Sequence, residues 1–445
     1  MDTKFQSSIY QGSEVIFILN NLIKRNKIVI FLLTYISYSS LHITRKSFSN
    51  IKNNLTDDWN FSENFLAKLD TTFMSAYGFG LIINGYFADK YGSKLLMVCG
   101  LFGTSIFFFA LPILKIIGIK IKGIYYAVWI LNGFFQSMGW PSTVNIMSKW
   151  FEEEFHSVIF GIWASNSSMG NILGNILISI CQQYNLSIVT MFAIPSLLLL
   201  VLAILSHWFI IQEPYDIICD TSSSNLSFAS NNSPDIDIYA CRRRRLLDDK
   251  PDDNLYSTYD KSNILVYALS FLFLKTVNYT LFFWLSYYLH ESFHLSKSKS
   301  DMISCLYDVG GIIGSMLTGV LLLRFPKYNV ITVIMLSLSI IPLLFLKYTS
   351  VISYIDINIT ILGYLLAGPS TIISTIVAAN LSNKHSKVKS TIIGFIDGLG
   401  SLGCGLFQIF IPVITQQYGW HYIFYFLIGF IIMSIICIIY KCKNN

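Results

Sequence analysis

Long apolar stretches alternate with short polar segments along most of this chain. A helix needs about 20 predominantly apolar residues to cross a bilayer, and a helix satisfies its own backbone hydrogen bonds there. The pattern therefore predicts an all-α membrane protein with about twelve transmembrane helices. The expected spans are 28–50, 65–87, 94–114, 123–149, 157–182, 187–212, 263–290, 300–323, 329–347, 356–382, 390–415 and 420–440.

The first span carries charge where a membrane helix is normally apolar. Its apolar run, Ile28–Ile43, is too short to cross a bilayer, so we expect the helix to continue through Arg45 and Lys46. Helical spacing places Tyr38, His42 and Arg45 on one face. Two interpretations stay open at this point. Either that face lines a buried anion site, or both cations snorkel to the headgroups from a helix end.

The two halves of the chain repeat each other with an offset of six spans. Such a parallel duplication is typical of two six-helix bundles related by pseudo-symmetry. Small residues recur in any packed membrane helix, so it is the shared register of several matches that favours duplication. The matching positions are Gly85 and Gly319, Gly161 and Gly394, and the segments 139–144 and 367–372.

A polar stretch rich in Ser, Asn and Asp separates the two halves. It is predicted to be a disordered linker. Its run Arg242–Arg245 is interpreted either as an anchor on the cytosolic side or as a sorting or lipid-contact signal. The expected organisation is an N-terminal tail (1–27), a six-helix bundle (28–212), the linker (213–262), a second six-helix bundle (263–440) and a short tail (441–445).

Composition agrees with a membrane protein and narrows its chemistry. The chain is 53% apolar and only 13% charged, which excludes an ordinary soluble domain. Its eight cysteines show neither CxxC nor metal-ligand spacing, and there is no nucleophile–base pair or nucleotide-binding loop. We therefore expect a protein that is not an enzyme, has no cofactor and no metal site, and does not bind nucleic acid.

Lysines and arginines are concentrated in the segments that share a side with the N-terminus. The positive-inside rule therefore predicts that both termini are cytosolic. Lys441 and Lys443 match a dilysine retrieval pattern, which favours the endoplasmic reticulum or another endomembrane. If these lysines serve only as a positive-inside anchor, a location in the plasma membrane remains an alternative. Asn54 and Asn60 begin glycosylation triplets in the first non-cytosolic loop and are candidate glycan acceptors.

The loop after the second span carries a recognisable motif. Its sequence, Gly85-Tyr-Phe-Ala-Asp89-Lys90-Tyr-Gly92-Ser93-Lys94, resembles the G-x-x-x-D-R/K-x-G-R-K/R loop of the major facilitator superfamily. The resemblance implies that Asp89, Lys90 and Lys94 make charge contacts that hold the two halves together in one state and break in the other. The second half lacks the acid of this motif.

Further stretches narrow the resemblance to one branch of that superfamily. They look like the organophosphate:phosphate antiporter family, and in particular its eukaryotic sugar-phosphate exchanger branch, which is similar to glycerol-3-phosphate transporters. This resemblance implies a twelve-helix carrier that exchanges a phosphorylated metabolite for inorganic phosphate across a lipid bilayer and works as a monomer. The stretches are 42–52, 70–85, 132–144, 161–174, 275–289, 307–319 and 393–405.

In that family a basic residue of the first helix and one of the seventh grip the phosphate. Arg45 matches the first position, and Lys275 is the candidate for the second. The sequence departs from the bacterial members, whose second cation would fall on Asn278. It also lacks the histidine that several members carry near Asn166. The full set of expected substrate contacts is Arg45, Lys46, Lys275, His42, Tyr38, Asn278, Tyr279 and Asn166.

Two acidic residues, Asp308 and Asp397, fall at similar depth in spans 8 and 11. Buried carboxylates need partners, and we expect them to pair with the cations Arg45, Lys46 and Lys275. Three positive charges against two negative ones leave about one positive charge, which favours an anion in a low dielectric.

Three alternatives stay open. Lys275 pairs only with a carboxylate and does not meet the substrate. An acidic residue carries protons, so that the protein is a symporter or a carrier of another organic anion. Finally, the chain is a membrane adaptor that transports nothing and acts through its linker.

Overall fold

The computed structural model describes residues 2–217, 261–348, 354–383 and 388–443, and these are helical almost throughout. The first half contains α1 (Asp2–Asp57), α2 (Glu63–Tyr91), α3 (Ser93–Ile116), α4 (Lys122–Gln136), α5 (Gly139–Trp150), the short η1 (Glu153–Phe155), α6 (His156–Trp163), α7 (Asn166–Gln183) and α8 (Ile188–Phe209). The second half contains α11 (Lys261–Phe293), α12 (Lys297–Arg324), α13 (Tyr328–Tyr348), α14 (Ile355–Thr371), the π-helical turn η4 (Ile372–Val377), α15 (Ala378–Asn383), α16 (Lys389–Tyr418) and α17 (Trp420–Lys443).

These helices make twelve crossings. Nine helices in the described ranges are long and apolar enough to span a membrane. A tenth crossing is α2, which carries more polar residues, and the last two are the broken pairs α4–α5 and α6–α7. The break after α4 has a covalent cause, because Pro141 lacks the N–H that would bond to the carbonyl of Ser137. The predicted all-α, twelve-span architecture is confirmed.

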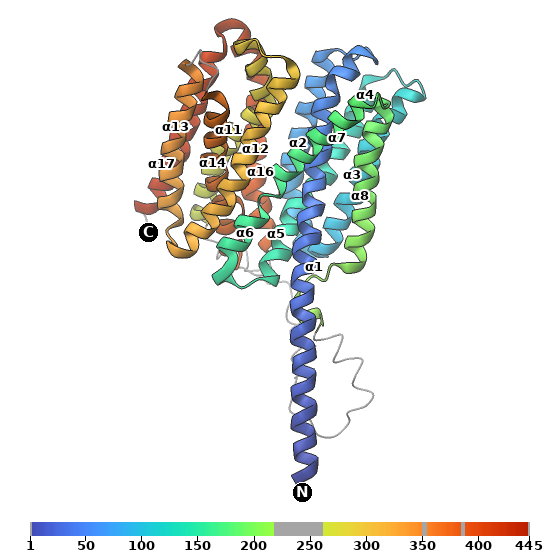
Figure 1. Ribbon diagram of the computed structural model, residues 1–445, viewed down its shortest axis with the longest axis vertical. Coiled ribbons are helices and arrows are strands. Elements are labelled where there is room, and N and C mark those ends of the chain that lie inside the picture. The colour runs from blue at the N-terminus through green and yellow to red at the C-terminus, as the bar shows by residue number, and fades with distance from the viewer. Residues whose placement is uncertain (1, 218–260, 349–353, 384–387, 444–445) are drawn as a thin grey trace.

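The crossings form two bundles that lie side by side (Figure 1). One contains α1–α8 and the other α11–α17. We call the end at which α1 enters and α17 finishes the terminal end, and the opposite end the distal end. Residues 2–27, predicted to be a tail, continue α1 as a helix that projects beyond the terminal end. Most of the predicted linker, including Arg242–Arg245, lies outside the described residues.

Two long seams join the bundles: α2 packs along α16, and α12 packs along α6 and α7. Counted as membrane spans, span 2 packs on span 11 and span 5 packs on span 8. Because span n of the first half corresponds to span n+6 of the second, the two seams are equivalent under the repeat. The glycines of the sequence repeat meet at equivalent places in these seams. A Cβ added to Gly161 would lie 2.8 Å from the Cα of Gly319, and one added to Gly394 would lie 3.2 Å from the Cα of Gly85. The repeat in the sequence therefore encodes the close approach of the two halves.

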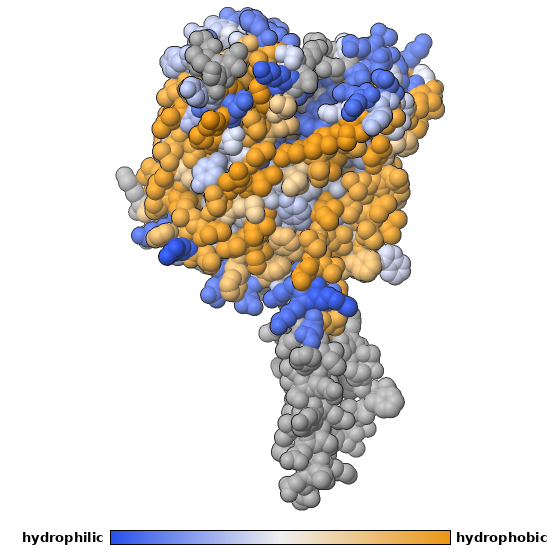
Figure 2. Space-filling view, viewed as in Figure 1, coloured by the Kyte–Doolittle hydropathy of each residue, from blue (hydrophilic) through white to orange (hydrophobic). Residues whose placement is uncertain are grey.

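The outer surface matches a bilayer. On the face that Figure 2 shows, a broad apolar belt covers the body of the molecule, and hydrophilic residues gather at the two ends. Large apolar side chains in this belt are exposed, among them Leu197 at 62% and Leu406 at 63%. Large exposed apolar patches mark surfaces that contact another protein or a membrane, and the nine apolar helices favour a membrane here. Of the two glycosylation triplets, Asn54 lies within α1, whereas Asn60 lies in the exposed turn before α2.

We predict that Gly161→Ala and Gly394→Ala each lower the melting temperature of the purified protein in detergent. The new methyl group has no room, and overpacking of this kind costs about 1–3 kcal/mol. Gly429→Ala in α17 is the matched control, because nothing lies within 4 Å of its added Cβ. Equal melting temperatures for all three variants would contradict the tight packing of the seams.

Candidate functional site

A cavity of about 160 Å³ lies between the two bundles, and both contribute to its wall. Eight residues expected from the sequence line it: Tyr38, His42 and Arg45 on α1, Lys275, Asn278 and Tyr279 on α11, Asp308 on α12 and Asp397 on α16. The helical face predicted for α1 is therefore turned inward. The interpretation that Arg45 and Lys46 reach the headgroups is wrong, because Arg45 lines this cavity and Lys46 is only 8% exposed.

Arg45 is held entirely by neutral groups. Its Nε donates to the side-chain oxygen of Gln136 on α4, and its Nη1 donates to the hydroxyl of Tyr279, 3.1 Å away in the other bundle. The guanidinium lies over the ring of Tyr77, 4.2 Å from the ring centre. Its Nη2 is buried and has no hydrogen-bond partner among the described residues. Among the described residues, no carboxylate forms an ion pair with Arg45, so its positive charge faces the cavity unpaired.

Lys275, in contrast, has an ion-pair partner. Its Nζ lies 2.8 Å from the carboxylate of Asp397 and 2.8 Å from the hydroxyl of Ser401, both on α16. Both charged side chains are 6% exposed. The pair nevertheless forms part of the cavity wall, so Lys275 meets the cavity as one member of a neutralised pair. Lys275 therefore has a carboxylate partner, as one alternative expected, and it also lies in the cavity wall, as expected for a substrate contact.

Lys46 lies beside the cavity rather than in its wall. It packs against α7, where a Cβ on Gly174 would lie 2.9 Å from the Lys46 Cβ, and its Nζ lies 5.0 Å from the ring centre of Phe282. From there it interacts electrostatically with Asp308. Asp308 also accepts a hydrogen bond of 2.8 Å from Asn171.

Asn171 joins the two bundles through a short polar chain. Its side-chain oxygen lies 3.1 Å from Nδ1 of His42 on α1, while its amide nitrogen donates to Asp308 on α12. Because the amide of Asn171 donates to Asp308, its oxygen is left to accept from the ring of His42. His42 therefore carries its proton on Nδ1. Through Asn171, these hydrogen bonds connect α1 to α12 of the opposite bundle.

Of the remaining expected contacts, Asn278 and Tyr38 lie in the cavity wall and Asn166 does not. Asn278 donates to Ser370 at 2.7 Å and accepts from Tyr307, and the hydroxyl of Tyr38 lies 3.3 Å from that of Tyr77. These groups form a hydroxyl- and amide-rich wall. Asn166 is fully buried away from the cavity, and its neighbours on α7 take the place expected for it. Polar residues of α7, α14 and η4 that line the cavity are Ser167, Ser168, Asn171, Ser370, Thr371 and Ser374.

Comparison with known proteins shows the family of this chain. The family model described as Major Facilitator Superfamily matches residues 30–407. "Sugar phosphate exchanger 3" of Mus musculus is 30% identical, with 90% of each chain covered. This chain belongs to the Major Facilitator Superfamily and, within it, to the sugar phosphate exchanger family. The predicted family is confirmed.

Two further similarities fit that placement. "Putative glycerol-3-phosphate transporter 5" of Arabidopsis thaliana is 26% identical, with 94% of this chain and 92% of the relative covered. A solved structure of the MFS proton:xylose symporter XylE covers 95% of this chain with a TM-score of 0.70. It is only 10% identical, so it supports the fold alone.

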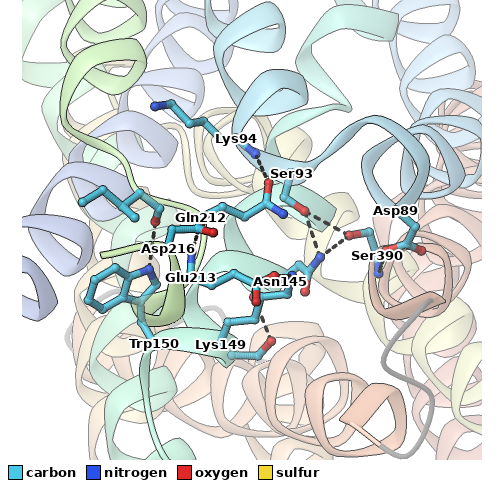
Figure 3. Close-up of polar contacts among 12 residues, drawn as sticks. Asp89, Ser93, Lys94, Asn145, Lys149, Trp150, Gln212, Glu213, Asp216 and Ser390 are labelled. Carbon is cyan, nitrogen blue, oxygen red and sulfur yellow. Dashed lines mark hydrogen bonds and ion pairs between the residues drawn. The ribbon is translucent and has the colours of Figure 1, made fainter. Parts of the chain in front are cut away.

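The superfamily motif after α2 lies at the terminal end, where it joins the bundles (Figure 3). The carboxylate of Asp89 accepts hydrogen bonds from the backbone N–H groups of Ser390 and Thr391, at 2.8 and 2.7 Å, in the first turn of α16. A carboxylate at a helix N-terminus is favourable because those N–H groups lack partners within the helix. Lys90 and Lys94 remain predicted gating residues. Lys90 lies over the ring of Tyr91, and the nearby Glu152 forms an ion pair of 3.7 Å with Lys27.

Several groups that shape the site could not be predicted from the sequence. Gln136 and Tyr77 hold Arg45, Ser401 holds Lys275, and Asn171 bridges the bundles. Each is a common residue in an otherwise apolar or small-residue stretch. Only a contact with a charged residue on another helix makes it important, and helical spacing does not report such contacts. No group of three or more His, Cys, Asp or Glu residues in the described ranges is arranged to hold a metal ion.

We predict that Asp397→Asn alone lowers the stability of the protein by about 3–5 kcal/mol, because it leaves the buried charge of Lys275 without its carboxylate. The double variant Lys275→Met/Asp397→Asn should regain most of that loss. The measurement is the thermal unfolding transition of each variant in the same detergent. If the double variant were no more stable than the single one, the two residues would not form an energetically coupled pair.

Proposed function

We propose that this protein exchanges a phosphorylated metabolite, such as a sugar phosphate or glycerol phosphate, for inorganic phosphate by alternating access. The observation that carries the proposal is the environment of Arg45. It faces the cavity, is held only by neutral partners and has a buried Nη2 without a partner among the described residues. A guanidinium presents N–H donors in a plane, which suits the oxygens of a phosphate.

The balance of charge supports an anionic substrate. Lys275 is neutralised by Asp397, and Lys46 lies in the field of Asp308, so Arg45 supplies the excess positive charge of the site. In a low-dielectric cavity that charge attracts an anion much more strongly than it would in water. The names of the relatives, which refer to sugar phosphate exchange and glycerol-3-phosphate transport, agree with a phosphate ester as that anion.

The position of the cavity supports transport rather than catalysis. Its wall combines residues of both bundles, so a rocking motion about the bound anion would expose it first at one end and then at the other. The hydroxyl and amide groups of α7, α11 and α14 would contact the non-phosphate part of the substrate. The cavity is complete within one chain, which supports function as a monomer.

We infer the orientation from the distribution of charge. The terminal end carries Lys24, Arg25 and Lys27 next to the membrane, and the positive-inside rule places this end in the cytosol. The endomembrane location stays a prediction. Accessibility of a tag on the N-terminus in intact and permeabilised cells tests the orientation.

The substrate test is counterflow in liposomes loaded with inorganic phosphate and supplied with radioactive phosphate, hexose phosphates, triose phosphates or glycerol phosphate. We predict uptake of phosphate and of at least one ester in exchange for internal phosphate, without a pH gradient. Arg45→Ala should raise the apparent KM at least about 30-fold, as expected for losing a charge-assisted contact of about 2 kcal/mol or more. Arg45→Lys should recover only part of the affinity, because a lysine lacks the planar fork.

The control for these variants is Arg324→Ala, which removes an exposed arginine at the end of α12. Uptake that requires a pH gradient and no internal phosphate would show a proton symporter instead. Normal exchange by Arg45→Ala would overturn the proposal. Exchange that survives replacement of residues 218–260 by a Gly/Ser sequence would exclude the adaptor alternative.

A further inference from the structure

The segment that follows α8 is fastened to the terminal end of the first bundle. Ile210 and Ile217 at its two ends are buried, at 0% and 6% exposure. The indole N–H of Trp150 donates to the carbonyl of Ile211 at 2.9 Å, and the side-chain oxygen of Gln212 accepts from the backbone of Lys94 at 3.5 Å. We call residues 210–217 the strap. It is thus a fixed part of the bundle and not a free beginning of the linker.

The strap places a carboxylate beside the contact that closes the terminal end (Figure 3). Glu213 forms an ion pair with Lys149 on α5, and its backbone N–H donates to Asp216 at 3.2 Å. One helical turn before Lys149, the amide of Asn145 donates to both Ser93 and Ser390 at 2.8 Å. Ser390 belongs to α16 of the other bundle, so the ion pair lies next to a hydrogen bond between the bundles.

A second lysine lies beside this contact, on the other bundle. Lys389 begins α16, immediately before Ser390. Lys389 interacts electrostatically with Lys149, Glu153, Glu213 and Asp89, and all four of these residues belong to the first half of the chain. Closing the terminal end therefore brings two lysines of opposite bundles together. Like charges at such a contact repel unless acidic groups lie between or beside them.

We propose that Glu213 is a positioning residue of the transport cycle, the counter-ion of Lys149 that allows Lys389 to approach when the terminal end closes. Glu213 and Lys149 belong to the same bundle, so they stay together when the bundles part, and only Lys389 leaves. Glu213 therefore favours the state closed at the terminal end. This role does not depend on which anion the cavity carries, and so it goes beyond the proposed substrate.

The test measures closure directly and uses no substrate. His156 on α6 and Asn380 on α15 meet across the terminal end, with 3.4 Å between Nδ1 and Oδ1, and neither residue belongs to the strap. A His156→Cys/Asn380→Cys pair, made with the eight native cysteines replaced, reports closure by the rate at which its disulfide forms under mild oxidation. Glu213→Gln should slow that rate about tenfold relative to the same protein with Glu213.

Two further variants separate charge from structure. Lys149→Gln/Glu213→Gln removes both charges of the pair, so the repulsion of Lys389 disappears and the disulfide rate should return to that of the parent. Glu154→Gln, which removes an exposed carboxylate at the same end, should leave the rate unchanged.

An equal rate for Glu213→Gln and Glu154→Gln would overturn the proposal. So would a double variant as slow as Glu213→Gln, because the strap would then matter only for folding. Since the readout needs no transported ion, a negative counterflow result would not affect it, and the two proposals fail independently.

Discussion

A positive charge inside a membrane protein is stable only where surrounding groups compensate for the lost water. This protein places three cations near its centre and compensates them differently. Lys275 has the carboxylate of Asp397, and Lys46 has the field of Asp308. Among the described residues, the contacts of Arg45 are with an amide, a hydroxyl and aromatic rings. These dipoles hold the guanidinium in place without cancelling its charge. A bound anion would neutralise the charge of Arg45. The proposed selectivity for anions follows because Arg45, unlike Lys275 and Lys46, has no carboxylate partner among the described residues.

The duplication of the chain explains how such a site can open to either end. The two seams, α2 with α16 and α12 with α6 and α7, exchange under the internal repeat, and glycines bring the backbones close in both. Side chains that meet across the cavity come from both halves, so any tilt of one bundle changes the cavity at once. Contacts described at the terminal end include polar ones, such as Asp89 with the first turn of α16 and Asn145 with Ser390. Polar contacts of this kind can break and form again at smaller cost than a packed apolar interface.

The extent to which the sequence predicts this structure depends on the kind of contact. The twelve crossings follow from hydropathy, and the inward face of α1 follows from the spacing of Tyr38, His42 and Arg45, because both are properties of a single helix. Whether Lys275 pairs with Asp308 or with Asp397 depends on how α11 is rotated relative to α12 and α16. Residue spacing within one helix does not predict that rotation. The same reason accounts for Gln136, which is recognisable only by its bond to Arg45. Lys46 and Asn166 lie next to residues of the wall on their helices, and a rotation of about 100° per residue turns them away from it.

Direct observation of an anion in the cavity tests the central claim most sharply. Arsenate has the shape and charge of phosphate, and its arsenic atom can be located by anomalous scattering in a crystal of the protein. We predict one arsenic peak between the bundles, about 4 Å from the guanidinium carbon of Arg45, as expected for oxygens hydrogen-bonded to its N–H groups. Arg45→Ala should abolish the peak. A peak elsewhere, or one that persists in Arg45→Ala, would contradict the account.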